Sequence, residues 1–245
     1  MADALTIAVQ SMQNDMLRMD AISQNVANVN TPGYRRTINT SLTFADVLQH
    51  TSLDGEVRGV GVTLPVVTSV LDDSAGQLIS TGKPLDLALT GNGYFELTTP
   101  HGLAYTRAGN FHIDERGELV NQNGYAVSGA GGGITVTGGG TPAIASNGDV
   151  SEDGRVIGHL RVVTFEDDHA LENTGDGLLR PMGSVSQPVD TSTAIRTGFL
   201  ENSNVVPLRE MISMLETSRH FESQQKLFQG YDEQISGAIQ KLGQF

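Results

Sequence analysis

Apolar residues recur at alternating spacings of four and three at both ends of this 245-residue chain, and this pattern restricts the folds open to it. The N-terminal segment runs from about Asp3 to Asn28, and the C-terminal segment from about Val205 to Leu242. The N-terminal positions are Leu5, Val9, Met12, Met16, Met19, Ser23 and Val26. The C-terminal positions are Met211, Met214, Ser218, Phe221, Gln225, Phe228, Asp232, Ile235, Ile239 and Leu242. Because a lone helix gains little stability from propensity, each seam needs a partner, either the other helix in a coiled coil or a neighbouring chain.

Strands and turns fill the sequence between the two helical segments. "PLDLALTG" places Leu85, Leu87 and Leu89 in alternation with polar residues, which predicts a half-buried strand, and "GHLRVVTF" at 158–165 predicts another. Glycine-dense residues 129–140 predict an exposed loop. Turn sequences recur at short intervals, namely "GNG" at 91–93, "DERG" at 114–117, "NQNG" at 121–124, "SNGD" at 146–149 and "EDGR" at 152–155.

The predicted fold is therefore α+β and multidomain, with a mostly antiparallel all-β domain flanked by two heptad-patterned helices that pair as a coiled coil. The expected parts are listed by residue range: an N-terminal helix of an inner helical domain (1–33), an elbow and extended connection (34–80), the β domain (81–190), a return segment (191–203) and the C-terminal helix of the inner domain (204–245).

The stretch "NVANVNTPGYRR" at 25–36 predicts how the first helix ends. Pro32 disfavours the helical conformation at Thr31, and Gly33 after it fits a type II turn, in which glycine takes a positive φ. We expect Asn25, Asn28 and Asn30 to bond the last helical carbonyls and the turn, which Tyr34 then completes. On this reasoning Gly33→Val misdirects the helix without unfolding the β domain, and Gly33→Asn is milder.

Composition and charge exclude several classes of protein. The net charge of −13 argues against a nucleic-acid partner, and no apolar run approaches the ~20 residues that a membrane span requires. No cysteine is present, so neither disulfides nor cysteine-based metal sites can form. His112 and Asp114 lack a third ligand nearby, so we expect no metal and no cofactor. The N-terminus lacks the pattern of a cleaved secretory signal peptide.

Two other functions are alternatives to a structural role, namely a hydrolase and an adhesin-like binding module. A wall-cleaving hydrolase would need a pair of carboxylates, and the candidates are Glu115, Glu118, Asp149, Glu152 and Asp153. They lie in glycine-rich turns, where acidic residues are common for reasons of turn chemistry. An adhesin-like module would need a concave or aromatic site on a β head, but aromatic residues make up only 5% of the chain.

The sequence closely resembles the bacterial flagellar rod and hook proteins, and the resemblance covers nearly the whole chain in the family's order. It begins with the N-terminal signature at 25–34 quoted above. The other segments that carry it are "SLTFADVLQ" (41–49), "GKPLDLALTGNGYFEL" (82–97), "AYTRAGNFHIDERGELVNQNGYAV" (104–127), "GHLRVVTF" (158–165) and "LENSNVVPLREMISMLETSRHFE" (200–222). Chain length and "DGLLRP" at 176–181 resemble the proximal rod component most, with the slightly longer distal rod component next.

The resemblance implies a structural subunit rather than an enzyme. Such a subunit would be exported through the flagellar type III apparatus and would polymerise in the periplasm into a helical tube that transmits motor torque. Its partners would be copies of itself and other axial flagellar proteins of the rod and hook. The heptad seams would then be contacts between subunits, because a head-to-tail contact that does not close generates a helical assembly.

Overall fold

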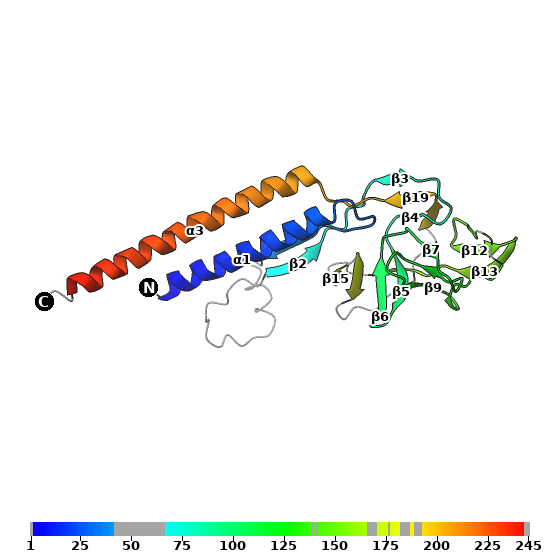
Figure 1. Ribbon diagram of the computed structural model, residues 1–245, viewed down its shortest axis with the longest axis horizontal. Coiled ribbons are helices and arrows are strands. Elements are labelled where there is room, and N and C mark those ends of the chain that lie inside the picture. The colour runs from blue at the N-terminus through cyan, green and yellow to red at the C-terminus, as the bar shows by residue number, and fades with distance from the viewer. Residues whose placement is uncertain are drawn as a thin grey trace, which may run out of the picture. The chain divides into compact units, whose positions relative to one another are not determined.

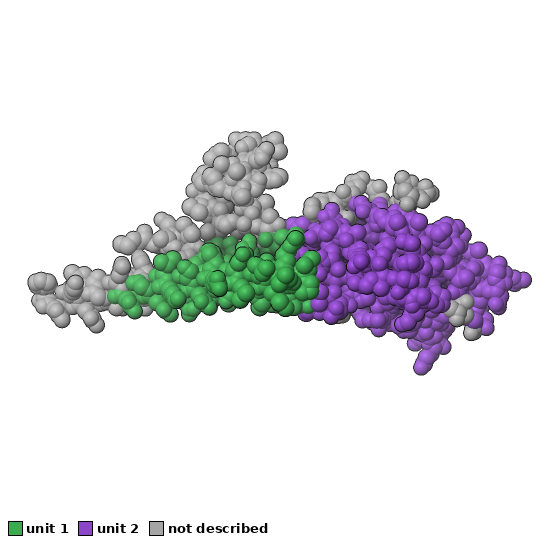
Figure 2. Space-filling model, turned by 90° about the horizontal axis from the view of Figure 1, so that it is seen from above, with its two compact units in different colours: residues 1–26, 37–69, 206–245 green, residues 27–36, 70–205 purple. Residues whose placement is uncertain are grey.

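The computed structural model describes residues 2–41, 67–138, 140, 142–165, 171–175, 177–181, 187–188 and 193–242. "SLTFADVLQ" lies outside them except for its first residue. The chain divides into two compact units (Figure 2): unit 1 comprises Met1–Val26, Thr37–Ser69 and Val206–Phe245, and unit 2 comprises Ala27–Arg36 and Val70–Val205. The finer five-part division remains a prediction from the sequence.

Two long helices dominate unit 1 (Figure 1). Helix α1 spans Ala2–Ala27 and helix α3 spans Pro207–Leu242, so both agree with the predicted limits to within two residues. Pro207 opens α3, where the missing N–H of proline costs nothing, and Glu210 follows in the first turn. Strands β1 (Thr37–Ser41) and β2 (Val67–Leu71) form a two-stranded sheet.

A ten-stranded sheet forms the body of unit 2, with the order β15-β16-β6-β5-β9-β8-β7 and three further strands attached to it. Strand β10 pairs with β9, β14 with β5, and β17 with β14, and the pairings within this sheet are antiparallel. Its strands are β5 (Tyr94–Thr99), β6 (Gly102–Thr106), β7 (His112–Ile113), β8 (Leu119–Val120), β9 (Ala126–Gly129), β10 (Gly132–Gly133), β14 (Val162–Thr164), β15 (Leu171–Gly175), β16 (Leu178–Pro181) and β17 (Gln187–Pro188).

Smaller sheets join parts of unit 2 that are far apart in the sequence. Strand β4 (Leu87–Thr90) pairs with β18 (Ala194–Thr197), and β3 (Leu78–Ser80) pairs with β19 (Phe199–Glu201). Strands β11 (Ala143–Ile144), β12 (Asp149–Glu152) and β13 (Arg155–His159) form a third sheet. Strand pairing therefore joins chain segments that come before the main sheet in the sequence to segments that come after it.

The predicted turns are confirmed, because "GNG", "DERG", "NQNG", "SNGD" and "EDGR" each separate two strands. The predictions for two other segments were wrong. "GHLRVVTF" is not one strand: the chain leaves β13 after His159 and enters β14 at Val162. The glycine-dense stretch is not a plain exposed loop, because it contains β10 and buries Ile134 and Val136. The alternating pattern that predicts a strand is not visible there, since glycines surround both apolar residues.

The core of unit 2 forms on both faces of the main sheet, since successive residues of a strand point to opposite faces. Phe95 packs edge-on against Phe111 in the larger cluster, with ring centroids 5.2 Å apart. In the smaller cluster the ring of Phe165 lies 4.9 Å from that of Tyr105. Leu87 and Leu89 are buried as predicted and belong to the larger cluster, but Ala88 between them is buried too, so β4 is covered on both faces and the prediction of a half-buried strand was wrong.

Candidate functional site: the Thr-Pro-Gly turn and the two helices

The turn after α1 has the backbone geometry that its sequence predicts. The amide of Tyr34 donates to the carbonyl of Thr31 at 3.3 Å, which places Pro32 and Gly33 at the two central positions of a β-turn. Gly33 has a φ of 68°, in the region that favours glycine. The Thr31 hydroxyl donates to the side-chain oxygen of Asn28 at 3.1 Å, so Asn28 serves the turn as expected.

The turn packs directly on the β structure of unit 2, which the sequence did not reveal. The amide of Gly33 donates to the carbonyl of Glu201 at 2.7 Å. A Cβ atom built on Gly33 would lie 2.3 Å from the backbone nitrogen of Ala108 and 2.3 Å from the carbonyl carbon of Arg107. The turn is therefore part of the folded unit rather than a hinge outside it, and glycine is required for contact as well as for φ.

A buried cluster of charges lies beside this turn. The Nη2 atom of Arg35 lies 3.0 Å from Oε1 of Glu201, and Nη1 of Arg107 lies 3.6 Å from Oε2 of the same carboxylate. Each of the three side chains is at most 5% exposed. Arg107 also donates to the carbonyl of Gly91 at 2.7 Å and stacks over the Tyr94 ring, and Arg35 donates to the carbonyl of Ser74. One carboxylate thus holds two guanidinium groups that are far apart in sequence.

Asp72 near this cluster provides a pH-dependent contribution to stability. Burial alone would raise the pKa of Asp72, but the hydroxyl and amide of Ser74, with Arg36 and Arg35, outweigh it and hold that pKa below the usual 3.8. A lowered folded-state pKa contributes stability that is present above pH 3.8 and is lost as the pH falls below it.

We expect Asp72→Asn to flatten the fall in the free energy of unfolding below that pH, measured by urea denaturation. Asp73→Asn, at the exposed neighbour, is the matched control, and an equal flattening there would contradict the assignment.

Asn25 at the end of α1 bonds a different partner from the one expected. Its side chain accepts from the amide of Thr37 at 2.8 Å and donates to the carbonyl of Thr37 at 2.9 Å, so it pairs like a strand neighbour. It also donates to Oε2 of Glu210 at 3.3 Å, within unit 1. Asn25 and Glu210 are both almost completely buried. Asn25 thus bonds residues on β1 and α3, which the sequence pattern did not predict, and Asn30 is exposed.

Polar side chains make the contact between α1 and α3. Asp15 lies 2.7 Å from the ring Nδ1 of His220, and Gln224 donates to the hydroxyl of Ser11 at 2.6 Å. With the Asn25–Glu210 bond, these pairs show that the helices run antiparallel within unit 1 (Figure 1). Each contacting residue lies one position before a predicted seam residue, as Asp15 precedes Met16. One position turns the helix by about 100°, so the apolar seam faces elsewhere.

Several apolar seam residues are consequently exposed. Met16 is 58% exposed, Met211 54% and Met214 42%. Val9 is also exposed, whereas Met12, Met19, Phe221 and Phe228 are partly buried. The side chains of Leu5, Ile235, Ile239 and Leu242 lie outside the described part of the structure. The assignment of these residues to contacts between subunits remains a prediction.

Two of the five carboxylates considered for hydrolysis, Glu152 and Asp149, are bonded within turns and loops. Glu152 accepts the amides of Gly138 at 2.8 Å and Thr137 at 3.3 Å. Hydrogen bonds with His159 and Asn147 lower the pKa of Asp149, opposite to the raised pKa that a general acid requires. Asp114 accepts the amides of Arg116 and Glu118 in its turn. These bonds give Glu152, Asp149 and Asp114 a structural role in their turns.

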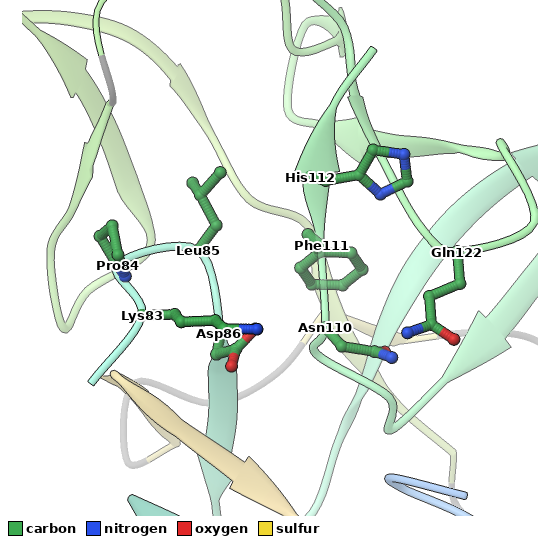
Figure 3. A pocket seen from close by; sticks show the side chains of 8 residues that line it. All are labelled: Lys83, Pro84, Leu85, Asp86, Asn110, Phe111, His112 and Gln122. Atoms are coloured by element: carbon green, nitrogen blue, oxygen red, sulfur yellow. The ribbon is translucent and has the colours of Figure 1, made fainter. Parts of the chain in front are cut away.

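A cleft in unit 2 offers no carboxylate pair either (Figure 3). Its lining residues are Lys83, Pro84, Leu85, Asp86, Asn110, Phe111, His112 and Gln122. Asp86 is the one carboxylate among them, and His112 and Gln122 lie on the opposite side of the cleft from Lys83 and Asp86. Among the described residues, no three potential metal ligands gather, and no helix is both long and apolar enough for a membrane span.

Three family models match the elements just described. "Flagella basal body rod protein" matches residues 5–35, which cover α1 and the turn. "Flagellar hook protein FlgE/F/G D1 domain" matches residues 88–158 of the β structure. "Flagellar basal body rod FlgEFG protein C-terminal" matches residues 196–240, which include Glu201 and most of α3. The matched segments therefore contain the turn, its charged partners and both helices.

Full-length relatives agree with these matches. The flagellar basal-body rod protein FlgG of Bacillus subtilis is 34% identical over 95% of this chain and 96% of the relative. The rod proteins FlgF of Mesorhizobium japonicum and of Salmonella typhimurium are each 30% identical over 99% of both chains. On these similarities over nearly its whole length, the chain belongs to the family of flagellar basal-body rod proteins.

Proposed function

We propose that this protein is a structural subunit of the bacterial flagellar rod, which polymerises into a helical tube and transmits motor torque through the periplasm. The family relationship supports the rod assignment, and the exposed apolar faces of both helices support polymerisation. The relatives are named as rod components, and this family is structural rather than enzymatic. The partners would be copies of this chain, other axial flagellar proteins, and the type III export apparatus that delivers it without a cleaved signal peptide.

The observation that carries this proposal is the apolar face of α3. Leu208, Met211, Ile212 and Leu215 follow the helical spacing i, i+3, i+4, i+7, and each is at least 49% exposed. A contiguous exposed apolar stripe of this kind marks a surface for another protein. Because α1 uses polar residues against α3, this stripe and the Met16 side of α1 stay available for the helices of neighbouring subunits. We infer that coiled-coil packing arises through these faces in the assembled rod.

Within the rod, we assign the chain to the proximal component, with the distal component as the alternative. Length supports this choice, because the distal component is expected to be slightly longer. Relatives called FlgG align over 263 to 276 positions, whereas relatives called FlgF align over 247 to 257. The 245-residue chain matches the shorter group in length, although its identity to the Bacillus FlgG is higher.

The proposal is tested by Met16→Asp. Because Met16 is 58% exposed, the charge should leave the isolated protein folded, and the helical content by circular dichroism should not change. Buried against a neighbouring subunit, the same unpaired charge should cost several kcal/mol for each contact, so rods and motility should be lost in a strain carrying the variant. Gln13→Asp, exposed on the same helix, is the matched control. Normal motility with Met16→Asp would exclude the seam as a subunit interface.

A further inference from the structure

One short segment contacts three parts of unit 2 that lie far apart in the sequence. This closing segment, residues Phe199–Val205, comprises β19 and the four residues after it. Its Glu201 accepts the amide of Gly33 through the backbone carbonyl at 2.7 Å and the amide of Gly76 through Oε1 at 2.9 Å. The amide of Asn202 donates to the carbonyl of Gln77 at 2.9 Å. The closing segment therefore bonds the turn after α1 and the chain before β3 at once.

The side-chain amide of Asn204 also bonds two different segments, one through its oxygen and one through its nitrogen. Its side-chain oxygen accepts the amide of Arg36 at 2.7 Å, across 168 positions of sequence. Its side-chain nitrogen donates to the carbonyls of Asp72 at 2.9 Å and Ser74 at 3.0 Å. A single side chain thus bonds backbone groups of two segments at the end of the β1–β2 pair, where the amide of Asp72 also donates to the carbonyl of Arg36 at 2.8 Å.

The backbone of the closing segment is packed closely against the residues before β3. A Cβ atom on Gly76 would lie 1.8 Å from the carbonyl oxygen of Asn202, so the two backbones are in direct contact. The third connected part is the loop that carries Arg107, whose guanidinium is buried beside Glu201. Glu201 of the closing segment thus supplies one carboxylate to both Arg35 and Arg107.

We propose that the closing segment is a latch that binds and releases the turn, the residues around Ser74–Gln77 and the Arg107 loop as one cooperative step. The contacts are mutually dependent, because each brings the segment into position for the others. It follows that unit 2 cannot be completed until residue 204 is free to bind.

Asn204→Ala tests the latch in the full-length protein by amide hydrogen exchange. The informative amides are those of Gly33 and Gly76, which bond Glu201 and make no hydrogen bond to Asn204. If the segment acts as one unit, both should exchange faster by a common factor, on the order of tenfold or more. The amide of Leu160, which bonds the carbonyl of Gly148, should keep its rate.

The matched control is Asn202→Ala, because the Asn202 side chain is exposed and its hydrogen bond to Gln77 is made by the backbone. Unchanged exchange at Gly33 and Gly76 in Asn204→Ala would overturn the latch, since the contacts would then be independent. Equal acceleration at Leu160 would overturn it as well, since the variant would be exposing these amides by global unfolding. The measurement uses the isolated protein, so failure to assemble into rods leaves its outcome unaffected.

Discussion

Gly33→Asn should destabilise unit 2 almost as much as Gly33→Val, although asparagine tolerates a positive φ far better than valine. The reason is the contact with Ala108, whose backbone nitrogen lies 2.3 Å from any Cβ placed on residue 33. Backbone atoms cannot turn aside as a side chain can, so the turn must separate from the sheet. Overpacking costs about 1–3 kcal/mol, and the φ strain adds about 1–2 kcal/mol for an ordinary residue. For a unit of this size, we expect a fall in melting temperature on the order of 10 °C.

Gly82 offers a control with nearly the same backbone conformation. Its φ is 69° and nothing lies within 4 Å of an added Cβ, whereas Gly33 has a φ of 68° and a backbone in contact. Thermal melts of Gly33→Asn and Gly82→Asn, followed by circular dichroism on the isolated protein, therefore separate contact from conformation. Gly82→Asn should melt within a few degrees of the parent protein. Equal shifts in the two variants would mean that φ, and not the contact with Ala108, decides the outcome.

Glu201→Met should produce a loss of similar or greater size, because it leaves two buried guanidinium groups without their carboxylate. Arg35 and Arg107 are each at most 5% exposed, so water cannot take the place of Glu201. Removing one partner from a buried ionic group costs about 3–5 kcal/mol. Urea unfolding of the isolated protein is the measurement. Glu172→Ala, an exposed acidic residue on β15, should change stability by less than about 0.5 kcal/mol.

A triple variant distinguishes unpaired charge from lost packing. When Arg35, Arg107 and Glu201 are all replaced by methionine, this cluster contains no charge, and a similar side-chain volume remains. Replacement of a whole buried ionic cluster is often neutral or stabilising, so the triple variant should be more stable than Glu201→Met alone. A triple variant less stable than the single one would show that the guanidinium hydrogen bonds to Gly91 and Ser74 matter more than the charge balance.

Local sequence patterns predicted the elements of this protein well. Proline at 207 and the Thr-Pro-Gly sequence each fix a helix limit through the backbone of a few neighbouring residues, and the glycine turns act at the same short range. The positive φ of Gly33 follows from the same local chemistry. Such features depend on residues that are adjacent in the chain, so the sequence displays them directly.

Long-range partners were not predictable in this way. Glu201 looked like any acidic residue at the entry to a helix, and Arg35 looked like a surface cation, yet the two are buried together. Asn25 bonds Thr37 and Glu210, which lie 12 and 185 positions away in the sequence. The helix contact was missed for a related reason: periodicity favours the apolar positions, whereas α1 and α3 meet through paired polar groups such as Asp15 and His220. Whether a polar side chain is buried and bonded depends on a partner elsewhere in the chain, and the residues next to it in the sequence do not identify that partner.

The antiparallel arrangement of α1 and α3 also determines where a fluorescent or affinity label can be attached. Because both helices belong to unit 1, a fusion at either end of the chain lies on the helices that we assign to subunit contacts. The β12–β13 hairpin belongs to unit 2, and its turn residue Arg155 is exposed. The chain contains no cysteine, so Arg155→Cys would create a single thiol for site-specific dyes. Rods built from such a protein could be followed under the microscope while both helical ends remain unmodified.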